Sequence, residues 1–96
     1  MMKIEKLTTN DSIKQVEGSI VSDMNGEKVM LSISNGKYYN LGDVGGRIWE
    51  LIDNPLPIST LVTKLMAEYE ISKQECEEQV LSFLELLRQE QLVIVV

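Results

Sequence analysis

The amino-acid sequence predicts an α+β fold in which a three-stranded antiparallel sheet is followed by three helices. Three observations predict it. Two Asn-Gly pairs separate short apolar alternations in residues 15–41, the hydrophobic period becomes helical after Gly42, and helix-boundary residues divide the remainder of the chain. Because the strand signals and the helix signals are segregated along the chain, they favour α+β over a βαβ repeat.

The predicted strands are residues 15–23, 27–34 and 37–41, joined into a meander. Asn25-Gly26 and Asn35-Gly36 lie between them. We expect a two-residue hairpin at each, because Asn-Gly accepts the positive φ that both central positions need. The middle segment alternates with period two, which predicts a strand with one buried face. Residues 1–11 show no period and predict a loosely held leader or a short edge segment.

Boundary residues define the first two predicted helices. The first begins with Asp43 as N-cap and ends at Asn54, because Pro55 disfavours helical geometry at the residue before it. The second covers about residues 58–69. Its expected inward residues are Leu61, Leu65 and Met66.

The third predicted helix has the clearest start. Ser72 and Glu75 form a capping box, and the helix then runs to about Gln89. Its expected inward residues are Cys76, Val80, Phe83, Leu84 and Leu87. Residues 92–96 predict a short terminal strand or a hydrophobic tail docked on the core. Three strands followed by three helices resemble a winged helix-turn-helix architecture.

Length and composition predict one small domain, residues 1–96, with its core at about 15–93. A chain of 96 residues with 44% hydrophobic and 25% charged residues is typical of a single globular domain. No segment has the length of apolar sequence that a membrane span or a signal peptide needs. The single cysteine, Cys76, cannot form an internal disulfide, so we expect a cytoplasmic location.

The absent residue types exclude several function classes. The chain has no His, so it can form neither a Ser-His or Cys-His nucleophile pair nor a His-based zinc site. Its net charge of −6 opposes binding to the phosphates of nucleic acid. We therefore predict a small binding module that is not an enzyme, needs no cofactor and binds no nucleic acid.

The remaining candidates for chemistry have simpler structural interpretations. Glu75, Glu77 and Glu78 are dense enough to suggest a divalent cation, but an acidic first turn of a helix explains them better, and no metal is expected. Cys76 is on the apolar side of its helix and predicts a buried structural thiol. The glycine-rich residues 42–46 lack the Lys of a phosphate-binding loop and predict a turn.

Two features indicate binding of another chain. The third strand is short, lies at one edge of the predicted meander, and carries Tyr38 and Tyr39. An edge strand exposes unpaired backbone groups that can accept a further strand. The third helix also has a second apolar stripe, Phe83 and Leu86. That stripe is interpreted equally well as one wall of a groove or as a widening of the core-facing surface.

One ordered set of residues extends along most of the chain. It consists of residues 36–41 (GKYYNL), 45–52 (GGRIWELI), 58–69, Ile71-Ser72, Val80, Phe83-Leu84, Leu87 and 91–93 (QLV). This set resembles the PqqD-like family of peptide-recognition domains. Members of this family recognise the leaders of ribosomally synthesised, modified peptides. The resemblance covers about residues 15–93, and a chain of this size is most similar to the stand-alone recognition protein of lasso-peptide biosynthesis.

This resemblance implies a binding mode and a set of residues. The leader would pair antiparallel with the third strand and lie in the cleft beside the third helix. Leu31 would lie at the floor of this cleft, and Glu75 and Glu78 at its rim. Leaders of the lasso class typically offer a Tyr, a Pro and a Leu to such pockets. The leader-binding residues that the resemblance implies are Leu31, Lys37, Tyr38, Tyr39, Asn40, Leu41, Glu75, Glu78, Gln79, Ser82, Phe83 and Leu86.

The functional hypothesis that follows is recognition of a lasso precursor by its leader. The bound precursor would be delivered to a partner leader peptidase, with the macrolactam-forming cyclase as a further candidate partner. One alternative is recognition of another modified-peptide class, for example in a pathway with a radical enzyme. A less favoured alternative is a winged-helix DNA-binding regulator, because residues 73–90 carry more acidic than basic side chains.

Overall fold

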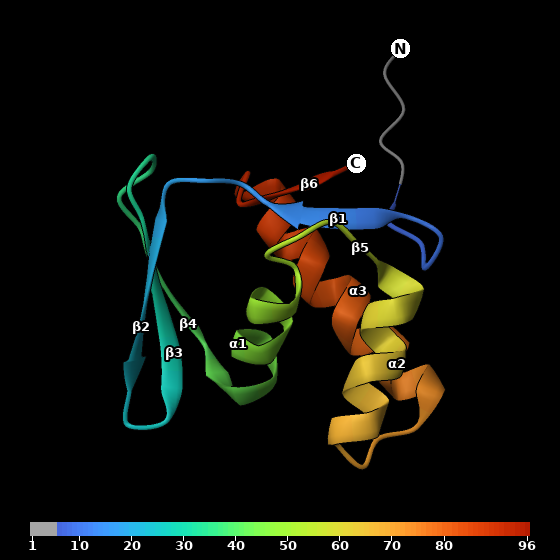
Figure 1. Cartoon of the computed structure of the whole chain (residues 1–96). Helices are drawn as coiled ribbons and strands as arrows, with labels where there is room; N and C mark the ends of the chain where they lie inside the picture. Colours follow the sequence, from blue (N-terminus) through green and yellow to red (C-terminus); the bar gives the residue numbers. More distant parts are fainter. Residues whose placement is uncertain (1–5) are drawn as a thin grey trace.

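The computed structural model describes residues 6–96 and confirms the predicted fold class, with a three-stranded antiparallel sheet beside three helices (Figure 1). The sheet has the order β2-β3-β4. Its strands are β2 (Ser19–Met24), β3 (Glu27–Ser32) and β4 (Tyr38–Leu41). The helices are α1 (Gly42–Leu51), α2 (Ile58–Glu68) and α3 (Lys73–Gln89).

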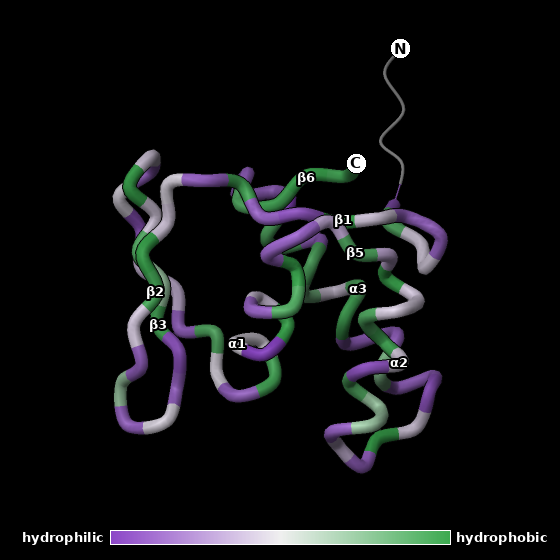
Figure 2. Tube along the Cα trace, viewed as in Figure 1, coloured by the Kyte–Doolittle hydropathy of each residue, from purple (hydrophilic) through white to green (hydrophobic). Residues whose placement is uncertain are grey.

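A second, small sheet was not predicted. In it β1 (Ser12–Gln15) lies between β5 (Leu56–Pro57) and β6 (Val93–Val95). The predicted first strand, 15–23, is confirmed for residues 19–23 but was given too early a start, because Gln15 belongs to β1 and the chain turns through Gly18, with φ of +105°, before β2 begins. Residues 92–96 form the expected short terminal strand, and Figure 2 shows β6 as uniformly hydrophobic.

Residues 7–11, which lie directly before β1, are packed onto the helices. Leu7 is buried, and its backbone N–H donates to a Glu85 carboxylate oxygen on α3 at 3.0 Å. The backbone N–H of Ile58 donates to the Asp11 carbonyl at 2.8 Å, which ties the segment to the start of α2. The expectation of a loosely held segment was therefore wrong for residues 7–11, and its residues 1–5 lie outside the described part of the chain.

Only one of the two Asn-Gly pairs forms a two-residue hairpin. Asn25 and Gly26 both have positive φ, of 57° and 85°, and join β2 directly to β3 as predicted. At the second pair only Gly36 has positive φ, and residues 33–37 form a longer connection. The Asn35 side chain accepts the Lys37 backbone N–H at 2.9 Å, which stabilises this wider turn.

The central strand β3 has one buried face, which consists of Met30 and Ser32. Leu31 therefore lies on the opposite face of the sheet from the helices, because successive strand residues alternate between faces. Its cross-strand partners, Ile20 on β2 and Tyr38 on β4, lie on that same face. Val21 and Tyr39 flank Met30 on the buried face.

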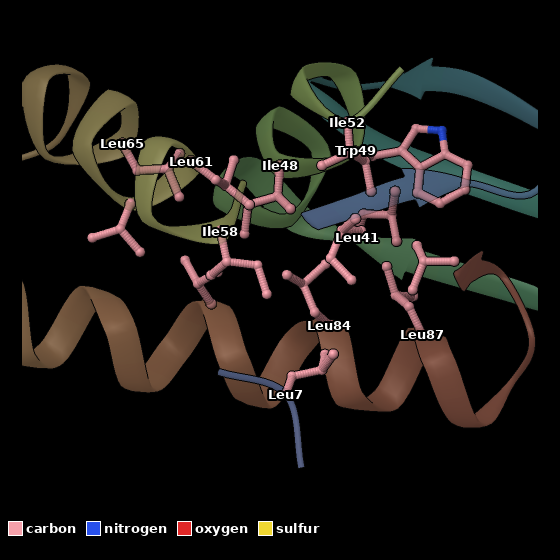
Figure 3. Close-up of a cluster of buried hydrophobic side chains, with 14 of the residues drawn as sticks. Leu7, Leu41, Ile48, Trp49, Ile52, Ile58, Leu61, Leu65, Leu84 and Leu87 are labelled. Carbon is pink, nitrogen blue, oxygen red and sulfur yellow. The ribbon is translucent and has the colours of Figure 1, made fainter. Parts of the chain in front are cut away.

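The core lies where the three helices meet and includes Trp49, which is 5% exposed (Figure 3). Ser72 caps α3 as predicted, accepting the Glu75 backbone N–H at 3.2 Å. Two helix predictions were wrong. Met66 is exposed, and Asp43 is not an N-cap, because α1 begins at Gly42, whose N–H donates to the Asn40 side chain at 3.0 Å.

Candidate functional site

A groove of about 640 Å³ runs between β4 and the C-terminal half of α3. One side is the whole of the predicted edge strand, residues 37–41. The other side is formed by the residues Phe83, Leu86, Leu87 and Glu90. The structure therefore brings the Tyr38-Tyr39 strand and the second apolar stripe of α3 to one place.

The free edge of β4 presents the backbone groups of Tyr38 and Asn40. The Ser32 N–H of β3 donates to the Lys37 carbonyl at 3.0 Å, so that carbonyl faces into the sheet. Along an antiparallel pair, hydrogen-bonded and non-hydrogen-bonded residues alternate. The register Leu31–Tyr38, Met30–Tyr39 and Val29–Asn40 then directs the backbone of Tyr39 toward β3 and the backbones of Tyr38 and Asn40 outward.

Phe83 forms the base of the helix wall. Its ring lies against α1, where a Cβ added at Gly45 would come within 3.0 Å of two ring atoms, so the absence of a side chain at Gly45 makes room for the ring. Phe83 is half-buried, and Leu86, one turn on, is 62% exposed. Of the two interpretations of this stripe, the structure favours the groove wall, since both residues line the groove.

A polar clasp joins β4 to the end of α3. The Tyr39 hydroxyl donates to Glu90 Oε1 at 2.7 Å, and Lys37 Nζ lies 3.1 Å from the same oxygen. The hydrogen bond from Tyr39, and then that from Lys37, lowers the pKa of Glu90. The hydrogen bond to Glu90 raises the pKa of Lys37 and, together with partial burial, that of Tyr39.

We expect the clasp to loosen in acid. Because the folded-state pKa of Glu90 lies below its ordinary value of 4.5, the clasp contributes stability above pH 4.5 and loses it as the pH falls through the folded-state pKa. In a pH titration by NMR, the Tyr39 ring signals should therefore shift with a midpoint below 4.5. The variant Glu90→Gln should abolish that transition, and an unchanged midpoint in this variant would contradict the assignment.

Five of the sequence-predicted site residues do not line the groove. Leu31, expected at its floor, lies on the opposite face of the sheet. Gln79 lies beside Tyr69 and Val44, and Ser82 turns toward the packed segment at Lys6 and Leu7. Glu75 and Glu78 are exposed in the first turns of α3 and are absent from the groove lining, because β4 reaches only the C-terminal half of that helix.

Two groove residues were missed. Leu87 was assigned to the core alone, and Glu90 was not singled out. The helical spacing contained a signal for Glu90, because it follows Leu86 by four residues and so continues the stripe of Phe83 and Leu86 along the helix.

Cys76 and the carboxylates considered as metal ligands lie in surroundings that suit a structural role. Cys76 is buried, its thiol donates to the Val62 carbonyl at 3.8 Å, and burial raises its pKa, all of which suit a structural thiol. Within residues 6–96, no three His, Cys, Asp or Glu side chains gather closely enough to hold a metal ion. No helix in that range is long and apolar enough to cross a membrane.

Comparison with known proteins identifies the family. The chain is similar in structure to TbiB1, solved in complex with the TbiA(beta) leader peptide, with a TM-score of 0.74 and 28% sequence identity over 83% of this chain and 93% of TbiB1. No curated protein sequence matches the chain significantly. The family model for coenzyme PQQ synthesis protein D (PqqD) matches residues 27–93, from β3 to the start of β6 and including the whole groove, and the chain therefore belongs to the PqqD family.

Proposed function

We propose that this chain binds the leader of a lasso-peptide precursor as an added strand on β4. The observation that carries the proposal is the free edge of β4 facing an apolar groove. The similarity to TbiB1, whose structure contains a leader peptide, supports the same ligand class. Strand addition supplies backbone hydrogen bonds, while side-chain pockets supply specificity.

In this mechanism the leader pairs antiparallel with β4 and forms its hydrogen bonds with Tyr38 and Asn40. Its side chains on the helix side enter the groove against Phe83 and Leu86. Because the Phe83 ring is half-buried and lies against Gly45 of α1, it presents a fixed apolar surface before the leader binds.

We further propose that the bound precursor is delivered to a partner leader peptidase, and that the macrolactam-forming cyclase receives it in the same way. Holding the precursor beside an enzyme raises its effective concentration there. The chain itself makes and breaks no bond in this mechanism. We place it in the cytoplasm, where the single, buried thiol of Cys76 would remain reduced.

Recognition of another modified-peptide class is the second candidate. One observation favours it: the family model that matches this chain is that of a coenzyme PQQ synthesis protein. A fluorescence-polarisation titration with a synthetic lasso-type leader tests between the two. We expect binding at micromolar concentration or below, and loss of binding when the leader's Tyr, Pro and Leu are replaced by Ala. No binding of the lasso-type leader would favour the second class, and equal binding of both peptides would contradict recognition of the Tyr, Pro and Leu side chains.

A proline at position 38 tests the added strand. Tyr38 begins β4 and its N–H faces outward, which is a position where an edge strand tolerates proline. The variant Tyr38→Pro should fold, because no hydrogen bond of the native ladder is lost, yet it should bind the leader at least about fivefold more weakly than Tyr38→Ala, which keeps the N–H. Equal affinities of the two variants would contradict strand addition at this residue.

A further inference from the structure

The outer face of the β2-β3-β4 sheet carries an apolar row that faces away from the helices. Ile20 pairs with Leu31, and Leu31 pairs with Tyr38, so the three side chains form one line across the three strands. Ile20 is 52% exposed and Tyr38 is 74% exposed, whereas Met30 on the other face is fully buried. We call these three residues the outer row.

The outer row ends at the edge where the leader is proposed to dock. Tyr38 belongs both to the row and to the lining of the groove. The wing formed by β2, β3 and β4 stands to one side of the helices, with its far face uncovered within residues 6–96 (Figure 1). A fourth strand beside β4 would therefore lengthen the outer row by one side chain.

The position of Tyr38 in β4 determines which leader side chain joins the outer row. Because the backbone of Tyr38 faces outward, the leader residue paired with it exchanges two hydrogen bonds, and the two side chains then lie next to each other on the same face. The next leader residue in either direction turns toward α3 and the groove. Two residues along, the leader meets Asn40, whose row also contains the polar Ser22.

We propose that the outer row is a second contact surface for the leader and selects an aromatic or large aliphatic side chain at the leader position paired with Tyr38. This inference rests on the proposed function and deepens it. Recognition then uses both faces of the added strand. The groove contacts one set of alternate leader side chains, and the outer row contacts one member of the other set. Leu31, which is outside the groove, takes part in recognition from this face.

A scan of the leader against two protein variants tests the proposal. Each residue of a synthetic lasso-type leader is replaced by Ser, and the affinity is measured for the unmodified chain, for Tyr38→Ser and for Leu31→Ser. We expect Tyr38→Ser to weaken binding about three- to fivefold, the size of one cross-strand pair. Leu31→Ser should weaken it less, because Leu31 pairs with Tyr38 and is separated from the leader by β4. We also expect one leader position whose replacement costs affinity with the unmodified chain but not with Tyr38→Ser.

Met24 provides the matched control. It is exposed, lies on the same strand and face as Ile20, and pairs with Glu27 beyond the end of β4. The variant Met24→Ser should therefore leave leader affinity unchanged. Leu31 is half-buried, so Leu31→Ser could unfold the β2-β3-β4 sheet. The Tyr38 side chain is more exposed, so Tyr38→Ser tests the proposal even in that case.

The possible outcomes separate this proposal from the proposed function. If the unmodified chain binds no leader, the proposed function fails. If Phe83→Ala weakens binding while Tyr38→Ser and Leu31→Ser do not, the groove stands and the outer row is overturned. If those two variants leave the affinity unchanged but convert a dimer into a monomer in sedimentation, the row binds a second copy of the chain instead.

Discussion

Replacing Phe83 by Ala is expected to weaken leader binding about tenfold or more. The ring lies between Gly45 of α1 and the groove, so it offers a rigid aromatic surface in a partly desolvated place. Side chains of this kind dominate the energetics of interfaces. Titration of the variant with the lasso-type leader gives the change in affinity, and urea denaturation of the same sample gives the change in the free energy of unfolding.

Two further variants separate binding from folding. Leu86→Ala removes a largely exposed groove residue, so it should lower affinity with little change in the free energy of unfolding. Met66→Ala removes an exposed apolar residue of α2 that does not line the groove, so it should change neither. Large destabilisation of Phe83→Ala with unchanged affinity would assign Phe83 to the core alone.

Replacing Trp49 by Ala is expected to lower the free energy of unfolding by about 3–5 kcal/mol. The indole is almost completely buried and points from α1 toward the strands, and its removal leaves a cavity that the neighbouring side chains fill only in part (Figure 3). A loss of this size is a large part of the stability of a small domain. The backbone contact at this residue, from Gln15 Nε2 to the Trp49 carbonyl at 2.6 Å, does not depend on the side chain.

The measurement for Trp49→Ala is urea denaturation followed by far-ultraviolet circular dichroism, because the chain has one Trp and the variant loses that fluorescence. Trp49 does not line the groove, so the part of the sample that remains folded should bind the leader normally. Stability equal to that of the unmodified chain would contradict the role of Trp49 in the core.

Short sequence motifs correctly predicted one turn and one helix start. Asn25-Gly26 forms the predicted two-residue turn, and Ser72 caps α3 as its spacing with Glu75 indicated. The same dipeptide at Asn35-Gly36 does not form such a turn, because only Gly36 has positive φ there, and the Asn35 side chain accepts the Lys37 N–H within a longer connection. Identical local sequence therefore gave different turns in different surroundings.

The pairing of strands far apart in the chain could not be predicted from the sequence. The small sheet joins residues 12–15 to residues 56–57 and 93–95, and such short strands carry too few residues to show a period. The apolar alternation around Leu31 indicated one buried face without showing which, and the burial of Met30 and Ser32 shows that it is the face opposite Leu31.

The candidate site was predicted in part for a related reason. Helical spacing identified the stripe of Phe83 and Leu86, but it could not show which part of α3 lies beside β4. The acidic first turns of the helix lie beyond the reach of the four-residue strand, and Ser82 faces the packed segment at Leu7. The clasp at Glu90 depends on contacts between residues far apart in sequence, because Lys37 precedes Glu90 by 53 residues and Tyr39 precedes it by 51.

The central claim is that the leader becomes a fourth strand beside β4, and amide hydrogen exchange tests it most directly. In the free chain the Tyr39 amide, bonded to β3, should exchange slowly, while the outward amides of Tyr38 and Asn40 should exchange fast. A saturating lasso-type leader should slow exchange at Tyr38 and Asn40 and leave Tyr39 unchanged. Leader binding with fast exchange retained at both outward amides would contradict the account.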